Sequence, residues 1–120
     1  AIAWTATAGR ERFDRVLVDA PCSGLGTLRS HPEVRWRRSP ENIGDLAQLQ
    51  RHILRSAAPS VTPGGAIIYS TCTLTRSEND DVVAAFLADR TDFEIDDPRP
   101  YLPAEARALV DAGGALRTYP

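Results

Sequence analysis

Apolar residues along the chain fall into short blocks whose spacing alternates between that of a strand and that of a helix. Residues 13–19 (FDRVLVD) form a β-branched apolar block, bounded by charge before it and by Pro21 and two glycines after it, which predicts a buried strand. Residues 66–71 (AIIYST) form a second such block, and a Pro-Gly-Gly turn at 63–65 precedes it. The pattern therefore predicts two strands.

Helical periodicity surrounds the second strand. Residues 23–39 have no sustained period and predict a connection, after which Ser39-Pro40-Glu41 supplies an N-cap, a proline at the first helical position and an acid in the first turn. The apolar face of this first helix is predicted at Leu46, Leu49, Ile53, Leu54 and Ala57. A second helix is predicted from Ser77 to about Asp89, with a buried stripe at Val82, Val83, Phe86 and Leu87. Residues 93–95 predict a short strand and residues 104–112 a short helix.

The order strand, helix, strand, helix predicts an α/β fold with a parallel sheet and flanking helices. In such sheets ligands bind beyond the carboxyl ends of the strands. Cys22 directly follows the first strand and Cys72 the second. If the strands are neighbours, about 4.8 Å apart, both thiols project into one crevice. A single cysteine is more often a small buried hydrophobic residue, but two at the same edge favour a functional role.

Length and composition bound the function classes. The chain has 120 residues, which suits one domain or a piece of a larger one, with 42% hydrophobic and 25% charged residues. No apolar run reaches the roughly 18 residues of a membrane span, and residues 1–9 lack a secretory pattern, so we expect a cytoplasmic protein without membrane contact. The cysteines form no CxxC pair, and His31 and His52 add no metal spacing, so neither a metal site nor a structural disulfide is expected.

Basic residues are unevenly distributed along a chain whose net charge is −2. All 14 are arginines, and four of them cluster with a tryptophan: Arg29, Arg35, Trp36, Arg37 and Arg38. Such a cluster is either a solvated loop or an RNA contact, because guanidinium groups pair with phosphates and an indole stacks on bases. The pattern leaves both interpretations open.

The wording of the two cysteine segments carries a resemblance. FDRVLVDAPCSGLGTLRSHPEVRW (residues 13–36) and LAQLQRHILRSAAPSVTPGGAIIYSTCTLTRSEN (residues 46–79) resemble motifs IV and VI of the RNA cytosine-5 methyltransferases of the Nop and Sun family, which includes the bacterial ribosomal RNA small-subunit methyltransferase B type. The match runs from about Phe13 to Leu87, and residues 116–120 resemble the lead-in to a later block. It implies a partial class I (Rossmann-like) methyltransferase fold that uses S-adenosylmethionine to methylate carbon 5 of cytosine in RNA, with ribosomal RNA as the expected partner.

Roles for individual residues follow from this resemblance. Carbon 5 of cytosine is a poor nucleophile, so its methylation needs a thiolate that adds at carbon 6. In the family this nucleophile corresponds to Cys72, while Cys22 corresponds to the cysteine implicated in product release. Asp19 would lie near N3 of the base and near the methyl donor, so that Asp19, Ala20 and Pro21 are the expected cofactor contacts. Pro21 makes this turn stiff, and Gly24 and Gly26 are expected to let the backbone approach a ligand.

The sequence also departs from the family pattern. The Gly-rich loop and the acids that bind S-adenosylmethionine should precede the first cysteine motif, yet residues 1–12 contain no GxG and only Glu11 as an acid. We therefore expect residues 1–120 to be the carboxyl-terminal portion of one methyltransferase catalytic domain, truncated at both ends and inactive by itself. Its apolar strand edge at residues 16–18 should pair with another copy of the chain or with residues 1–5 of the same chain. Two alternatives remain: a catalytically silent RNA-binding fragment, or an unrelated thiol enzyme in which a histidine lies beside a cysteine.

Overall fold

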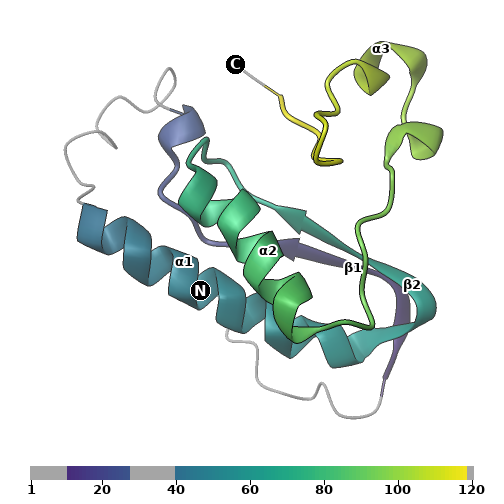
Figure 1. Cartoon of the computed structure of the whole chain (residues 1–120), viewed down its shortest axis with the longest axis horizontal. Helices are drawn as coiled ribbons and strands as arrows, with labels where there is room; N and C mark the ends of the chain where they lie inside the picture. The colour runs from purple at the N-terminus through teal and green to yellow at the C-terminus, as the bar shows by residue number, and fades with distance from the viewer. Residues whose placement is uncertain (1–10, 28–39, 119–120) are drawn as a thin grey trace.

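The structure is a computed structural model that describes residues 11–27 and 40–118 (Figure 1). Its helices and strands are, in chain order, β1 (Phe13–Asp19), α1 (Pro40–Ala57), β2 (Val61–Ser70), α2 (Asp80–Asp89) and α3 (Ala104–Arg107). Short 3₁₀ turns at 25–27, 58–60, 76–78 and 99–101 connect or precede these elements. None of the helices in this part of the chain is long and apolar enough to cross a membrane.

The two strands pair in parallel, as predicted. Val16 is the register partner of Ile67, and Asp19 is the partner of Ser70. The pairing extends one residue past β1, because the backbone N–H of Ala20 donates to the Ser70 carbonyl at 3.0 Å. The segments after β1 and β2 therefore leave the sheet at the same edge, which is the arrangement on which the functional prediction depends.

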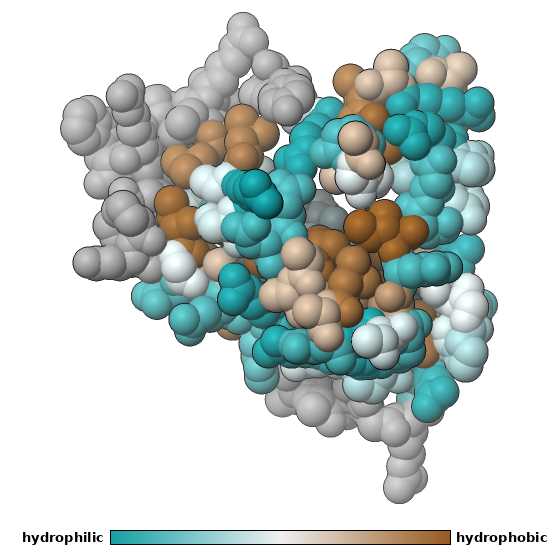
Figure 2. Space-filling view, in the orientation of Figure 1, coloured by the Kyte–Doolittle hydropathy of each residue, from teal (hydrophilic) through white to brown (hydrophobic). Residues whose placement is uncertain are grey.

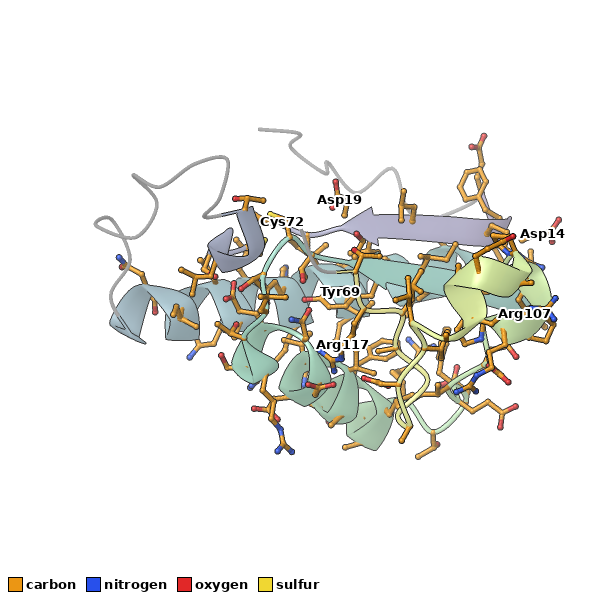
Figure 3. All side chains as sticks on the ribbon, turned by 90° about the horizontal axis from the view of Figure 1, so that it is seen from above. Asp14, Asp19, Tyr69, Cys72, Arg107 and Arg117 are labelled. Carbon is orange, nitrogen blue, oxygen red and sulfur yellow. The ribbon has the colours of Figure 1, made fainter. Side chains whose placement is uncertain are left out.

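Helices α1 and α2 cover the same face of this two-stranded sheet (Figures 1 and 3). Val16 and Val18 of β1 point into the core beneath them, with Leu54 of α1 and Val82 of α2. The other face is open among the described residues, where Leu17 is 63% exposed. The prediction of a buried strand is thus right for one face of β1 only, because side chains alternate across a strand and both described helices lie on one side.

The buried stripe of α1 differs from the predicted one. Leu49 is 45% exposed, whereas Gln50 is fully buried. Leu54 and Ala57 are buried as predicted, whereas nearer the start of the helix Ala47 and Gln50 are buried in place of Leu46 and Leu49. A glutamine can occupy this buried position because its amide nitrogen donates two hydrogen bonds, which offsets part of the cost of removing the side chain from water. The predicted cap at Ser39 lies outside the described residues.

The Pro-Gly-Gly segment is part of β2 and not a turn before it. Pairing moves from Phe13–Val61 to Arg15–Ala66, so that β2 has extra residues opposite β1. Gly64 has a φ of 79°, which a side chain would oppose, and a Cβ at Gly65 would lie 2.9 Å from the Asp14 carbonyl oxygen. These two glycines form a bulge in the strand.

Segments near the carboxyl end are less regular than predicted. Helix α2 begins at Asp80, after the 3₁₀ turn, and buries Val82 and Phe86. Residues 93–95 form no strand, because Phe93 packs edge-on against Phe86 instead, with ring centroids 5.2 Å apart. The helix predicted at 104–112 ends at Arg107, and an antiparallel bridge between Val110 and Leu116 comes after it. Figure 2 shows hydrophobic surface gathered where α2 faces this segment.

Candidate active site

The two cysteines lie side by side at the carboxyl edge of the sheet. Their Sγ atoms are 3.1 Å apart, and the backbone N–H of Cys72 donates to the Cys22 sulfur at 3.2 Å. Both thiols are free; Cys72 is exposed and Cys22 is half-buried. The prediction that the two thiols lie together at one edge of the sheet is therefore confirmed.

The environments of the two thiols differ. Burial and the hydrogen bond to the Cys72 thiol raise the pKa of Cys22 to about 11. At neutral pH Cys22 therefore keeps its proton. Because its S–H group lies within hydrogen-bond distance of the Cys72 sulfur, it can donate a hydrogen bond to that sulfur. The pair thus combines an exposed thiol that could act as a nucleophile, Cys72, with a neighbouring thiol that stays protonated, Cys22.

A buried carboxylate lies behind the thiols. Glu78 is fully buried and accepts hydrogen bonds at 2.6–3.2 Å from the Ser23 N–H and from side chains of Ser23, Gln50, Thr73 and Thr75. Burial by itself raises the pKa of this carboxyl, but the hydrogen bonds donated by Ser23, Thr75 and Gln50 outweigh it, so the pKa lies below its ordinary value. Glu78 is therefore ionised at neutral pH.

Neighbouring groups hold the two cysteine loops to each other. Gln50 donates to the Pro21 carbonyl at 2.8 Å, which connects α1 to the residue before Cys22. The Gly26 N–H donates to the Cys72 carbonyl at 3.0 Å, and a Cβ at Gly26 would lie only 2.7 Å from that oxygen. The close approach that the structure shows at Gly26 is to the other cysteine loop, and the expected approach to a ligand stays a prediction. Gly24 adopts a φ of 71° in the same turn.

Asn79 stabilises the loop around Cys72 from both sides. Its side-chain amide donates to the carbonyls of Thr73 at 3.0 Å and Thr75 at 2.9 Å. Its side-chain oxygen accepts a hydrogen bond of 2.6 Å from the Thr71 hydroxyl. The residues before and after Cys72 are thus tied to one side chain, which limits the loop conformations available to the thiol.

Asp19 lies at the tip of β1, at the same end of the sheet as Cys72 (Figure 3). Its side chain is exposed and points to the face opposite the helices, and it has no hydrogen-bond or ion-pair partner among the described residues. Ala20 is buried, and its N–H and the Pro21 carbonyl are already hydrogen bonded within the protein. Asp19 and Pro21 are both exposed, and of the three predicted cofactor contacts Asp19 is the one with a polar side chain available to a ligand.

Other predicted site residues are separate from the thiols or outside the described chain. The cluster Arg29, Arg35, Trp36, Arg37 and Arg38 lies outside the described residues, as does His31. His52 is exposed on α1, and the hydrogen-bond partners found for the two cysteines in the described ranges include no histidine. Those ranges also contain no group of three or more His, Cys, Asp or Glu side chains that could hold a metal ion.

Residues 3–120 match the family model described as 16S rRNA methyltransferase RsmB/F. The chain belongs to this family. It is 45% identical over 108 residues to the probable ribosomal RNA small subunit methyltransferase B of Bacillus subtilis, and 47% identical over 109 residues to the methyltransferase B of Thermus thermophilus. These matches cover 89% and 88% of the chain but only 24% and 27% of the relatives, so the chain spans about a quarter of their length.

A solved structure, the crystal structure of PH0851, resembles this RsmB/F family chain in three dimensions. It matches with a TM-score of 0.66 and 43% sequence identity, over 69% of this chain and 19% of that one. The resemblance predicted from the two cysteine motifs is thereby confirmed at the level of the family.

Proposed function

We propose that the chain carries the two thiols of an RNA cytosine-5 methyltransferase and acts within a longer RsmB-type enzyme. The 3.1 Å separation of the Cys22 and Cys72 sulfurs is the observation that supports this function best. Two thiols with different environments fit a reaction in which one adds to the base and the other assists release. We extend the proposal to the fold, a partial class I methyltransferase sheet, and to a cytoplasmic location.

Cys72 is the nucleophile in this mechanism. Its thiolate adds to carbon 6 of cytosine, a sulfur–carbon bond forms, and the electron pair of the 5,6 double bond becomes available at carbon 5. Asp19 stabilises the adduct by favouring a proton on N3 of the ring. After methylation, the carbon 5 proton passes to water, and the electron pair of that C–H bond restores the 5,6 double bond. The Cys72–carbon 6 bond breaks with its electron pair leaving on the sulfur, and Cys22 assists this release. The protonated Cys22 also donates a hydrogen bond to the Cys72 sulfur as that sulfur leaves carbon 6.

S-Adenosylmethionine, when bound, supplies the electrophilic methyl group. The exposed Asp19 carboxylate, which has no partner within the described ranges, fits a contact with this cation at the carboxyl edge of β1. Ala20 and Pro21 would support the same contact through the shape of the turn, since the Ala20 N–H and the Pro21 carbonyl are already hydrogen bonded within the protein. The chain thus offers one side of a cofactor site, and we propose that segments of the longer protein complete it.

RNA is the proposed substrate, with ribosomal RNA of the small subunit favoured by the family. The arginine cluster at residues 29–38 is proposed to contact phosphates. No observation in the described part of the chain favours the silent RNA-binding fragment or the histidine-dependent thiol enzyme over this mechanism.

The test uses the complete enzyme that contains this chain, small-subunit ribosomal RNA and S-adenosylmethionine. We expect 5-methylcytidine in the digested RNA by mass spectrometry, and none with Cys72→Ala, because the remaining thiol, Cys22, keeps its proton at neutral pH and does not replace the nucleophile. His52→Ala, on the exposed side of α1, is the matched control and should remain active. Normal 5-methylcytidine formation by Cys72→Ala would overturn the assignment of the nucleophile.

A further inference from the structure

The buried Glu78 carboxylate connects the two cysteine loops through the residue after each cysteine. Ser23 follows Cys22 and donates both its N–H, at 2.7 Å, and its hydroxyl, at 2.6 Å, to Glu78. Thr73 follows Cys72 and donates to the same carboxylate at 3.2 Å. Loops that are fifty residues apart in the sequence therefore meet on one side chain.

We propose that Glu78 is a positioning residue that holds the Cys22 and Cys72 sulfurs at working distance from each other. The catalytic consequence rests on the proposed function, whereas the positioning of the thiols does not. Glu78 contacts neither sulfur, and it acts through Ser23 on one loop and through Thr73 and Thr75 on the other.

The charge of Glu78 makes it suited to this task. An ionised carboxylate only accepts hydrogen bonds, so every N–H and O–H group around it must point toward it, which fixes the direction of each donor. No arginine pairs with Glu78 among the described residues. Hydrogen bonds from uncharged donors in both loops and in α1 stabilise its negative charge instead. Such donors come together at one point only when the loops are correctly placed, so the carboxylate favours a single arrangement of the thiols.

Glu78 is itself anchored independently of the loops. The Gln50 amide of α1 donates to it at 3.1 Å and also to the Pro21 carbonyl, one residue before Cys22. The Tyr69 hydroxyl donates to the Glu78 backbone carbonyl at 2.8 Å, which ties its main chain to β2. Glu78 is therefore held by the packed core, and its position determines where the two cysteine loops lie.

The experiment measures the distance between the thiols apart from catalysis. Dibromobimane becomes fluorescent when it joins two nearby thiols. In the complete enzyme, the signal of the Cys22–Cys72 pair is the fluorescence that is lost when Cys22 is changed to serine (Cys22→Ser). Glu78→Ala should reduce the rate of this cross-linking about tenfold or more, and it should lower kcat about 10²-fold with a smaller change in KM, because misplacement of about 1 Å has that effect on rate. Glu105→Ala, an exposed glutamate of α3, is the matched control and should change neither.

Glu78→Gln is the conservative variant. Its amide oxygen can accept from the Ser23 N–H and from Gln50, while its amide nitrogen donates to the Ser23 and Thr75 hydroxyl oxygens, which can rotate. We expect this variant to recover most of the cross-linking and most of kcat. Glu78→Met fills a similar volume but does not replace these hydrogen bonds, so it should recover neither the cross-linking nor kcat. Recovery by Glu78→Met would show a role that merely fills space and would overturn the proposal.

The loop contacts are tested by Ser23→Ala, which keeps the carboxylate and removes one donor from the Cys22 side. It should slow cross-linking less than Glu78→Ala, and the double variant should be no worse than Glu78→Ala alone, because both changes act through one contact.

If Glu78→Ala does not fold, the folded Ser23→Ala and Thr73→Val variants decide the question by the same cross-linking rate. Wild-type cross-linking in folded Glu78→Ala, or in both loop variants, would overturn the proposal. Slower cross-linking in an enzyme that forms no 5-methylcytidine would support it and refute the proposed function alone.

Discussion

The hydroxyls of Ser23 and Thr73 lie 2.8 Å apart, although the residues are fifty positions apart in the sequence. Each directly follows one of the two cysteines, and both hydroxyls also bind Glu78. The two thiols are thus neighbours because the polar residues beside them meet behind them in the core. The geometry of the thiols is therefore sensitive to substitutions that leave both cysteines in place.

Removal of Cys22 should separate addition from release. With Cys22→Ala in the complete enzyme, Cys72 can still add to carbon 6, but release is slowed, so a covalent protein–RNA species should accumulate. It would migrate slowly in a denaturing gel and disappear after ribonuclease treatment. Accumulation in Cys72→Ala instead would show that the roles of the two cysteines are reversed.

The two thiols should react with iodoacetamide at different rates. The pKa of Cys22 is raised from 9.0 to about 11, so its thiolate fraction at pH 8 is about 10²-fold lower than that of an ordinary thiol. Because the thiolate is the reactive form, modification of Cys22 should rise about tenfold per pH unit up to about pH 11. Peptide mass spectrometry should find the exposed Cys72 modified first at pH 8. Urea-unfolded protein serves as the control, in which both sites should react alike; similar rates in the folded protein would contradict the prediction.

Asp19→Asn should slow turnover while leaving the fold intact. The side chain is exposed and has no partner in the described ranges, so its loss costs little stability. A charge that favours protonation of the ring typically contributes about 10²–10⁴-fold, and kcat should fall by that order. Steady-state methyl transfer in the complete enzyme, with thermal melting as the check of folding, measures this. Full activity would leave Asp19 with no catalytic role.

Gly26→Ala should destabilise the protein and disturb the site. A Cβ there would lie 2.7 Å from the Cys72 carbonyl oxygen, and forcing backbone apart typically costs about 1–3 kcal/mol. Gly44→Ala in α1 is the matched control, because a Cβ there meets nothing within 4 Å and alanine favours a helix by up to about 1 kcal/mol. Urea unfolding of both variants should show shifts of opposite sign. A neutral Gly26→Ala would mean that the Cys72 loop moves freely.

The 120-residue chain by itself should bind S-adenosylmethionine weakly or not at all, and it should self-associate. Leu17 and Ile68 are register partners, 63% and 52% exposed on the sheet face that no described helix covers. Leu17→Lys should therefore reduce concentration-dependent association in light scattering. Tyr101→Lys, which changes a 71% exposed side chain elsewhere, should not. Micromolar cofactor binding in calorimetric titration by a monomeric chain would contradict both expectations.

Local patterns were sufficient for the main elements of this protein. The boundaries of β1 follow from one apolar block between charges and a Pro-Gly turn, and α2 ends at Asp89, where its apolar stripe stops. The positions of Cys22 and Cys72 at one edge also follow from the sequence, because parallel strands end on the same side of a sheet. The element boundaries depend on residues close together in the chain, whereas the shared edge also requires that β1 and β2 pair, which the structure shows.

Only the tertiary structure decided how the site is supported. Gln50 takes the buried position that the helical pattern predicts for Leu49. Glu78 is predicted only as part of a helix start, because an isolated polar residue is normally assigned to the surface. Both are buried because donors and acceptors from α1, from β2 and from two distant loops meet there. Likewise, Phe93 extends no strand because Phe86 offers it a ring to pack against. The sequence alone determined that each thiol directly follows a strand, whereas strand pairing, long-range hydrogen bonding and packing determined that the two thiols meet and what holds them together.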